Sequence, residues 1–430
     1  MKILLIQLSD DKIAQPVYPI GLAYIAASLT GHDIRMLDQN VCDSPFQKTA
    51  EAMREFCPDV VGISIRNVRL YSSRDKSFRY YHEQLGPTIK AVRNVSKDAI
   101  IIAGGAGFSI WPEKIMESEP EIQFGVFLEG ENTFRRLLEN LGSPEKVNGV
   151  FIRDKNGIRM AGHYSGPDFA SMPVPRRDLN DPRLYKGEYA VGIQTKRGCA
   201  LRCSYCNYPY LSGGTVRKRP AKDVVDEIER LKAEHGMDEF TFVDNVFNVP
   251  VTHAEEICRE MIRRGVKARW SAWFNEKFMD EGFIDLAIEA GCGRFELSPD
   301  GYSNKSLKWL NKNIETRHII KTYRILRRKP EAEVWYNFMI GIPGQDVVSL
   351  ARLAFFCLRL KVFLGKRLKG ISFNKLCIVP NTELEKVALE DKIISREADL
   401  LSPYFYEVGV LRWIKKLKWF RSLVRAVSDR

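Results

Sequence analysis

The stretch Cys199-Ala-Leu-Arg-Cys203-Ser-Tyr-Cys206 holds three thiols in the spacing C-x3-C-x2-C. Just before it, Val191-Gly-Ile-Gln-Thr-Lys-Arg-Gly198 is predicted to form a strand that ends in a glycine turn. The three thiols therefore lie on one loop at the carboxyl end of a strand, close enough to bind one metal centre.

Three kinds of site fit this loop. A zinc ion normally takes a fourth protein ligand or keeps an open water position. A cubane iron–sulfur cluster held by three thiolates leaves one iron free for a substrate or a cofactor. Three unrelated buried cysteines are the plain alternative, because cysteine is a common core residue. The close spacing in a basic loop flanked by glycine favours a metal centre.

Length and composition indicate a protein of two or three domains. The chain has 430 residues, of which 45% are apolar, and no apolar run approaches the length of about 20 residues that a spanning helix needs. The first residues run directly into Asp10 and Asp11, so no secretory signal is predicted. Nine cysteines in such a cytosolic-looking chain favour reduced thiols or metal binding over disulfides.

The charge of the chain bears on its partners. A net charge of +12 favours an anionic partner, such as nucleic acid, an anionic membrane or an acidic substrate. Solubility of the surface alone is the other explanation. The six histidines show no spacing typical of a metal site, and we expect them to be surface or structural residues.

Residues 1–145 alternate between strand and helix patterns, which predicts a doubly wound parallel sheet, a Rossmann or flavodoxin-like domain. Ligands bind such sheets at the carboxyl ends of the strands. The predicted strands are Lys2–Leu8, Asp33–Asp38, Asp59–Ile65, Ala99–Gly105 and Gln123–Leu128, and the predicted helices are Tyr18–Leu29, Phe46–Phe56, Tyr80–Ser96 and Asn132–Leu141.

Residues 146–188 are predicted to form a linker with a hairpin over Val147–Met160, and residues 189–385 a second domain. Five repeats of strand and helix plus a sixth strand predict a partial (β/α)6 TIM-like barrel, with functional residues at the carboxyl ends of its strands. The strands after the first are predicted at Glu239–Asn248, Ala268–Asn275, Arg294–Gly301, Val334–Gly344 and Gly370–Pro380, with helices such as Ala221–His235 and Val251–Arg264 between them.

The cysteine motif resembles that of the radical S-adenosylmethionine (SAM) enzymes. The resemblance implies a [4Fe-4S] cluster held by Cys199, Cys203 and Cys206, with SAM on the free iron. Gly341-Ile-Pro-Gly344 is similar to the family's turn after the fifth strand, whereas the family's G-G-E turn is absent, and Asp244 and Asn245 stand in its place. The SAM-binding residues implied are Tyr205, Asp244, Asn245, Ser298, Asn337, Gly341 and Pro343.

The first domain resembles a cobalamin-binding domain in the strand that ends at Ser64 and in the turns at Gly104-Gly105 and Glu129-Gly-Glu131. The family's cobalt-ligating histidine is absent, because the segment Ser9–Pro19 contains none. We expect a side chain of the loop Arg66–Tyr71 to face the lower side of cobalt. A flavodoxin-like domain without a ligand is the alternative. The cobalamin-binding residues implied are Ser64, Ile65, Arg66, Asn67, Gly104, Gly105, Glu129 and Gly130.

Together, the two halves resemble the cobalamin-dependent radical SAM enzymes of the class B methyltransferase type. The resemblance implies methylation of an unactivated carbon by way of a 5′-deoxyadenosyl radical and methylcobalamin, with an electron donor of the flavodoxin or ferredoxin type. A cyclase or rearrangement enzyme is the alternative, and a non-catalytic cobalamin or SAM regulator is less favoured because the cysteine triad is intact. No catalytic residue is assigned. Trp273, Trp335, Tyr336 and Cys377 are predicted either to line the substrate pocket or to pack the barrel.

The C-terminal region 386–430 is predicted to be helical and basic. Apolar residues recur there at helical spacing, and cations occupy most of the remaining positions. Such a helix either binds an anionic membrane from the cytoplasmic side, with a lipid among the possible substrates, or docks on the barrel. No specific nucleic acid is expected as a partner. The apolar positions are Val410, Trp413, Ile414, Leu417, Phe420, Val424 and Val427.

Overall fold

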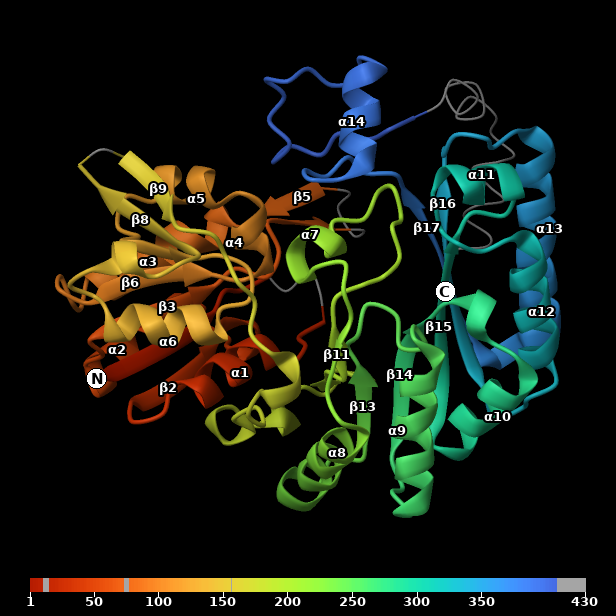
Figure 1. The fold of residues 1–430 in the computed structure, drawn as a ribbon, viewed down its shortest axis with the longest axis horizontal. Helices are drawn as coiled ribbons and strands as arrows, with labels where there is room; N and C mark the ends of the chain where they lie inside the picture. Colours follow the sequence, from red (N-terminus) through yellow and green to blue (C-terminus); the bar gives the residue numbers. More distant parts are fainter. Residues whose placement is uncertain (11–14, 73–76, 156, 408–430) are drawn as a thin grey trace. The chain divides into compact units, whose positions relative to one another are not determined.

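The computed structural model describes residues 1–10, 15–72, 77–155 and 157–407. The chain divides into two compact units, Met1–Gly192 and Ile193–Arg430 (Figure 1). Each unit is built around its own sheet. The predicted C-terminal amphipathic pattern, Val410 to Val427, lies outside the described residues.

The first unit contains a seven-stranded sheet in the order β2-β1-β3-β6-β7-β8-β9. Neighbours from β2 to β7 are parallel, and the last two pairs are antiparallel. The observed boundaries lie within about two residues of the predicted ones, because long apolar runs mark the buried strands. The strands are β1 (Lys2–Gln7), β2 (Asp33–Asp38), β3 (Val60–Ser64), β6 (Ile100–Gly104), β7 (Phe124–Val126), β8 (Val150–Asp154) and β9 (Gly157–Ala161).

Six helices accompany this sheet. Apolar side chains of α1 and α6 share one core with the strands, including Leu22, Phe134 and Leu137. Helices α2 and α3 pack against each other. The structure adds two short helices, α4 and α5, that the sequence did not predict. The helices are α1 (Ile20–Ser28), α2 (Pro45–Phe56), α3 (His82–Arg93), α4 (Ala106–Ile110), α5 (Pro112–Ser118) and α6 (Glu131–Glu139).

The predicted hairpin after residue 146 is confirmed, since β8 and β9 pair antiparallel. The hairpin extends the first sheet, and the segment 146–188 belongs to the first compact unit. A second hairpin, β4 (Arg69–Ser72) with β5 (Ser77–Tyr80), lies where we expected a loop to follow Arg66.

The second unit contains a six-stranded sheet in the sequential order β10-β13-β14-β15-β16-β17, and the pairs from β13 to β17 are parallel. Both sheets agree with the predicted α/β fold class. The strands are β10 (Gly192–Ile193), β13 (Glu239–Phe242), β14 (Arg269–Phe274), β15 (Cys292–Asp300), β16 (Glu333–Ile340) and β17 (Leu368–Lys375).

Helices connect these strands and lie outside the sheet, with α12 and α13 on its outer flank (Figure 1). Among the described residues, none of the helices is long and apolar enough to cross a membrane. The helices are α7 (Tyr208–Ser212), α8 (Ala221–His235), α9 (Val251–Arg263), α10 (Glu281–Glu289), α11 (Asn304–Trp309), α12 (Thr316–Arg327), α13 (Val347–Leu364) and α14 (Glu383–Glu390).

The strand predicted over Val191–Gly198, before the cysteines, is shorter in the structure. Only Gly192 and Ile193 join the sheet as β10, and β11 (Lys196–Arg197) instead pairs antiparallel with β12 (Arg217–Lys218). The physical reason is that the backbone N–H groups of Thr195 and Lys196 donate to the Asp244 carboxylate, at 2.8 and 3.2 Å. These two donors are therefore unavailable to a longer parallel strand.

Candidate active site

A pocket of about 450 Å³ in the second unit collects the cysteine loop and the carboxyl ends of several strands. All three thiols of the motif line it. So do five further residues that the sequence predicted to bind SAM or substrate, together with Lys312, which the sequence did not single out. Those five are Tyr205, Asp244, Asn245, Trp273 and Ser298.

The cysteine loop turns at Gly198, whose φ of +87° is the left-handed conformation that glycine favours. A Cβ at this position would lie 2.0 Å from the carbonyl oxygen of Thr215, so no other residue fits. The loop continues with a hydrogen bond of 3.0 Å from the Cys199 N–H to the Gly213 carbonyl. The backbone conformation at the start of the cysteine loop therefore requires glycine at position 198.

The three thiols are free and half-buried. Burial raises the pKa of Cys203 to about 11, against the opposing effect of the Lys312 charge, and burial also raises the pKa of Cys206. Among the described residues, no three Cys, His, Asp or Glu side chains already converge on the position of a single ion. A cubane cluster gives each thiolate its own iron, and three thiolates without a histidine are a donor set that fits such a cluster.

A buried polar network stands beside the thiols. Asp300, in the left-handed conformation at a φ of +63°, accepts hydrogen bonds from Ser298, at 2.9 Å, from Tyr205 and from Lys312. Lys312 also donates to the Tyr205 hydroxyl at 3.0 Å. The carboxylate of Asp300 raises the pKa of Lys312 well above its usual range despite burial, so the amine is charged.

Sequence reasoning missed Asp300 and Lys312. Tyr205 was predicted from its place before the third cysteine, and the structure shows that its hydroxyl is held by these two residues. Burial, with the Asp300 charge nearby, raises the pKa of Tyr205 far above its usual value and keeps the phenol protonated. Lys312 lies more than 100 residues from Tyr205 in the chain, and no local pattern links them.

Asp244 is fully buried and committed to bonds within the protein. In addition to the backbone N–H groups of Thr195 and Lys196, the Asp244 carboxylate binds the Thr195 hydroxyl and the Lys196 ammonium, the latter at 3.1 Å. Its side chain therefore holds the segment before the thiols in place. Asn245, the next residue, lines the pocket and donates to the Gly198 carbonyl at 3.5 Å, so it is the more available of the two for a ligand.

Three residues predicted to bind SAM, Asn337, Gly341 and Pro343, lie on β16 or in the turn that follows it. The Asn337 side-chain nitrogen is buried without a hydrogen-bond partner among the described residues, which leaves it a donor for a ligand. Gly341 begins the turn after β16 at a φ of +92°, and its N–H donates to Gln345 at 2.7 Å. Pro343 lies within the same turn.

The predicted substrate-pocket residues fall in different environments. Trp273 lines the pocket and is 38% exposed, and Trp335 packs over Gly370. Tyr336 is fully buried, and its ring contacts Phe338 and Phe356 of α13. We therefore assign Tyr336 to the layer between sheet and helices, because alternate strand residues face opposite sides. Cys377 follows β17, and its backbone forms an isolated antiparallel β-bridge with Phe405.

In the first unit, Ser64 and Gly104 are register partners at the carboxyl ends of β3 and β6. Gly105 follows with a φ of +100°, and a Cβ there would lie 2.7 Å from the Ile65 carbonyl oxygen. A Cβ at Gly104 meets only ordinary contacts, the nearest at 3.5 Å. The two glycines therefore differ: Gly105 is required by the fold, whereas the fold tolerates a Cβ at Gly104, which lies at the edge where such sheets bind ligands.

Three more residues predicted to bind cobalamin lie just after β3. Arg66 and Asn67 both donate to Asp10, which the sequence did not single out, and Asn67 does so at 3.4 Å. The Ile65 side chain is fully buried, so this residue offers only its backbone.

The Glu129–Gly130 turn completes this edge. The Glu129 N–H donates to the Tyr164 hydroxyl at 3.1 Å. Gly130 is the N-cap of helix α6, and a Cβ there would lie 3.0 Å from Ile25 and from Val126. The turn is thus closely packed against the core of the first unit.

Known families match both units. Residues 9–138 match the family described as the B12 binding domain, and residues 193–357 match the radical SAM superfamily. These matches cover the Ser64 and Gly104 edge of the first sheet and the cysteine pocket of the second unit.

Individual relatives cover much of the chain. An uncharacterized methyltransferase of Pyrococcus horikoshii is 23% identical over 98% of this chain and 89% of the relative. The cytidylyl-2-hydroxyethylphosphonate methyltransferase of Streptomyces wedmorensis is 29% identical over 76% of this chain and 69% of the relative. The anaerobic magnesium-protoporphyrin IX monomethyl ester cyclase of Synechocystis is 27% identical over 72% of this chain and 62% of the relative.

A solved structure shares the fold of the whole chain. It is the radical S-adenosylmethionine methyltransferase TsrM from Kitasatospora setae, with tryptophan substrate and a SAM analogue bound. The TM-score is 0.83 at 21% identity, and the match covers 100% of this chain and 89% of that chain. At this identity the likeness establishes the fold alone.

Proposed function

This chain belongs to the cobalamin-dependent radical SAM proteins, and we propose that it is a methyltransferase that transfers a methyl group to an unactivated carbon of its substrate. The observation that carries the proposal is the pocket in which the three thiols, the Tyr205 network and the strand-end residues Asn245 and Ser298 meet. The methyltransferases among the relatives support the same reaction.

We assign the residues of this pocket as follows. Cys199, Cys203 and Cys206 would hold a [4Fe-4S] cluster, which supplies the electron that cleaves SAM to a 5′-deoxyadenosyl radical. The Tyr205 ring would lie beside the adenine, its orientation fixed by Asp300 and Lys312.

Other side chains would bind the polar parts of SAM. Asn245 and Ser298 line the pocket, and the Asn337 side-chain nitrogen, which has no hydrogen-bond partner among the described residues, offers a further donor. The backbone of the turn from Gly341 to Pro343 would lie against the adenine. Asp244 would act through the backbone that it holds rather than by direct contact. The indole of Trp273 would shield the reacting carbon from water.

In the first unit, the edge formed by Ser64 and Gly104 would hold the cobalamin that carries the methyl group. The lack of a side chain at Gly104 would allow the backbone to approach a bulky ligand. Arg66 and Asn67, both held by Asp10, would help to hold the bound cobalamin at this edge.

The test is anaerobic reconstitution with iron, sulfide and cobalamin, followed by turnover with SAM and a candidate substrate. Radical methylation predicts both S-adenosylhomocysteine and 5′-deoxyadenosine as products. A protein with a full cluster and cobalamin that yields neither product would contradict the proposal.

The second candidate function is a ring-forming or rearranging reaction that uses cobalamin without methyl transfer. The cyclases among the relatives favour it. The same reaction mixture separates the two functions, because a cyclase would release 5′-deoxyadenosine without S-adenosylhomocysteine.

The substrate that we propose is a small molecule or a lipid, reached in the cytoplasm with peripheral contact to an anionic membrane. The support is helix α13, which carries most of its exposed apolar side chains on one face. Phe355 is 62% exposed, Leu358 54% and Val362 65%, at helical spacing. Such an apolar stripe on a surface helix is typical of an interaction site.

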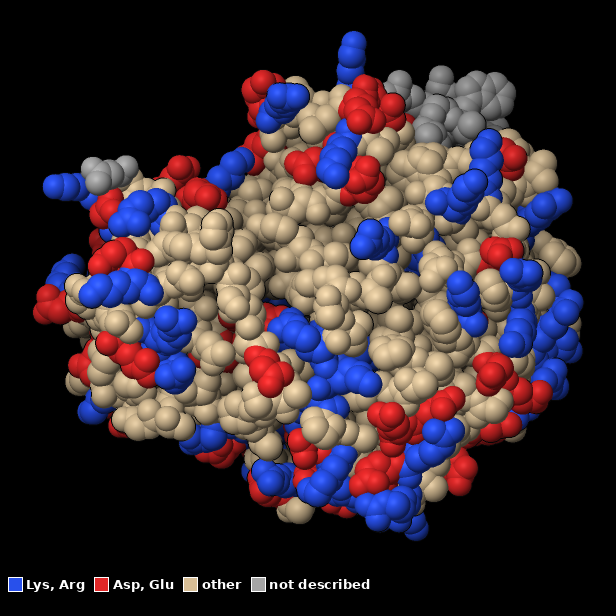
Figure 2. Space-filling view, viewed as in Figure 1, with Lys and Arg blue, Asp and Glu red and all other residues tan. Residues whose placement is uncertain are grey.

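The charge around this stripe supports an anionic surface as the partner. Helix α13 contains Arg352, Arg359 and Lys361 and no acidic residue among its 18 positions. Figure 2 shows further Lys and Arg side chains on the flank where Figure 1 places α12 and α13. Apolar side chains that enter the acyl boundary, with cations that meet the head groups, are the features of an interfacial helix.

A further inference from the structure

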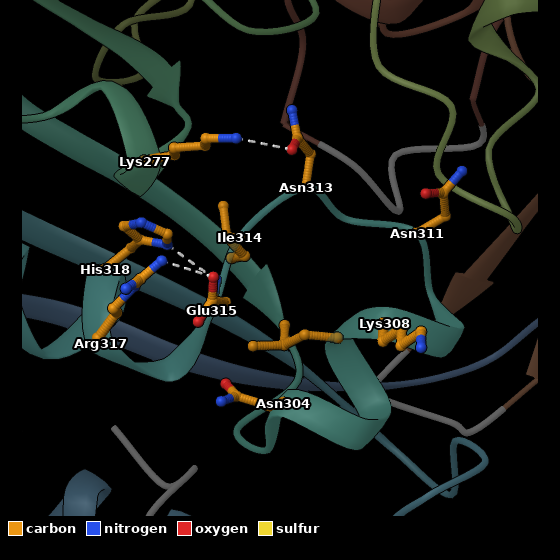
Figure 3. Close-up of a pocket in the computed structure, with 10 residues that line it drawn as sticks. Lys277, Asn304, Lys308, Asn311, Asn313, Ile314, Glu315, Arg317 and His318 are labelled. Carbon is orange, nitrogen blue, oxygen red and sulfur yellow. Dashed lines mark hydrogen bonds and ion pairs between the residues drawn. The ribbon is translucent and has the colours of Figure 1, made fainter.

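A second pocket of about 460 Å³ lies beside the loop 310–315 that follows helix α11 (Figure 3). Lys277, Lys308 and Arg317 give its rim a positive charge, and all three side chains are exposed. The loop itself contributes the amides of Asn311 and Asn313. None of these residues has a role in the function proposed above.

The loop contributes residues both to this pocket and to the cysteine pocket. Asn311 and Asn313 have φ values of +51° and +58°, and between them Lys312 points to the opposite side, into the cysteine pocket. Asn311 donates to the Arg202 carbonyl at 2.7 Å, and the Leu310 carbonyl accepts from the Ser204 N–H at 2.9 Å. The loop 310–315 is therefore hydrogen-bonded directly to the loop that carries the three thiols.

Within the described residues, only one of the three rim cations, Arg317, pairs with a carboxylate. Between residues 301 and 328 the only acidic residue is Glu315, which pairs with Arg317 at 2.8 Å. Lys277 donates to the neutral amide of Asn313 at 2.9 Å, as Figure 3 shows, and within the described residues neither Lys277 nor Lys308 has a carboxylate partner. The surface therefore keeps its positive charge. The cations of this segment are Lys305, Lys308, Lys312, Arg317, Lys321, Arg324, Arg327 and Arg328, of which Lys312 pairs with Asp300 and Arg328 with Glu281.

We propose that this cationic surface is the docking site of an acidic one-electron donor protein. The inference rests on the proposed function, because each cleavage of SAM consumes one electron. The reduced donor would lose one electron to the cluster, and that electron would then enter the C–S bond of SAM, which breaks into methionine and the 5′-deoxyadenosyl radical. Complementary charge both steers such a partner and orients it against the loop 310–315 beside the thiols.

The test compares two reductants on the reconstituted full-length enzyme. The double variant Lys277→Glu and Lys308→Glu reverses two charges of the rim and leaves the thiols untouched. With a reduced acidic flavodoxin as donor, we expect the KM for flavodoxin to rise about tenfold, because charge reversal replaces attraction by repulsion. With titanium(III) citrate, the rate of 5′-deoxyadenosine formation should stay within about twofold of the wild type, since a small chelate needs no protein docking surface.

The matched control is the double variant Lys90→Glu and Lys97→Glu, which reverses two exposed charges in the first unit. It should leave the KM for flavodoxin unchanged. An equal rise in both double variants, or none in the Lys277 and Lys308 variant, would overturn the docking site.

Binding of oxidised flavodoxin, measured by calorimetry at low and high salt, needs no turnover. Weaker binding at high salt and in the rim variant is the expected result. This measurement tests the surface even if the enzyme turns over no substrate with titanium(III) citrate, an outcome that would count against the proposed function alone. Equal affinity of the wild type and the rim variant would contradict the proposal.

Discussion

The Lys312 ammonium donates a hydrogen bond of 3.0 Å to the Tyr205 hydroxyl, and so joins the loop after α11 to the middle of the cysteine motif. Both groups also bind the Asp300 carboxylate. Two residues from separate parts of the second unit, Asp300 and Lys312, therefore fix the position of the Tyr205 ring between the second and third thiols.

Replacement of Lys312 by Met should destabilise the second unit. The Asp300 side chain is only 5% exposed, and loss of its cation leaves a buried charge without compensation. We expect a loss of about 3–5 kcal/mol in the free energy of unfolding, measured by urea denaturation. Lys308→Met, at an exposed position of α11, is the control and should change it by less than about 0.5 kcal/mol. Equal stabilities of the two variants would show that the ion pair of Lys312 and Asp300 does not stabilise the second unit.

Replacement of Cys199, Cys203 or Cys206 by Ala should abolish the cluster and all SAM cleavage, because each thiolate is one of three protein ligands. The measurement is iron content and visible absorbance after anaerobic reconstitution, together with 5′-deoxyadenosine production. Cys57→Ala removes an exposed thiol of the first unit and should change neither. A normal cluster spectrum with full 5′-deoxyadenosine production in any of the three variants would refute the assignment.

Gly104→Val should block cobalamin while the first unit stays folded. A Cβ at Gly104 has its nearest contact at 3.5 Å, so the fold accepts a side chain there, and valine adds bulk at the strand end beside Ser64. We expect at least a tenfold weaker affinity for hydroxocobalamin by absorbance titration, about 1.4 kcal/mol or more. Gly105 is unsuitable for this test, because its Cβ would lie 2.7 Å from a backbone oxygen and would disturb the fold itself. Unchanged affinity in Gly104→Val would place the cofactor elsewhere.

The sequence predicted the fold well because its signals are local. Apolar runs and glycine turns mark most strands of both sheets to within a few residues, and the cysteine spacing needs only eight consecutive positions. The residues that were missed act over long separations. Asp300 and Lys312 meet Tyr205 only in the folded chain, and the Asp244 carboxylate shortens the strand before the thiols by taking its amides. The spacing of apolar residues along the sequence carries no information about such contacts.

Glu276 should make the stability of the protein depend on pH. It is 1% exposed, its carboxylate oxygens have no hydrogen-bond partner among the described residues, and burial raises its pKa from 4.5 to about 7. Between these two values the folded state keeps a proton that the unfolded state has lost, so stability falls as pH rises from 4.5 to about 7 and then levels off.

Glu276→Gln removes this titration. We expect the variant to be more stable than the wild type at pH 8, by up to about 3 kcal/mol, with a smaller difference at pH 5. Urea unfolding at the two pH values measures it, and Glu289→Gln, at an exposed position of α10, is the control. An equal difference at both pH values would mean that the carboxyl does not titrate in this range.

The apolar face of α13 should bind anionic vesicles. The triple variant Phe355→Glu, Leu358→Glu and Val362→Glu should no longer float with them at low salt, because it replaces three exposed apolar side chains by acids. Leu184→Glu, at a position that is 50% exposed in the first unit, is the control and should float like the wild type.

A form that ends at Tyr406 separates this face from the C-terminal segment. If α13 carries the binding, the truncated protein should still float with anionic vesicles. Loss of flotation on truncation alone would assign the binding to the C-terminal segment, and absence of the wild type from the vesicles would refute membrane contact.

The hairpin of β8 and β9 also protects the first sheet from other chains. Without it, the outermost strand would be β7, whose residues Gly125 and Val126 are buried. The hairpin instead presents β9, an antiparallel strand with the charged Arg159 exposed at its middle. Charged edge strands resist pairing with a second molecule, so the segment after residue 146 guards against aggregation at this edge.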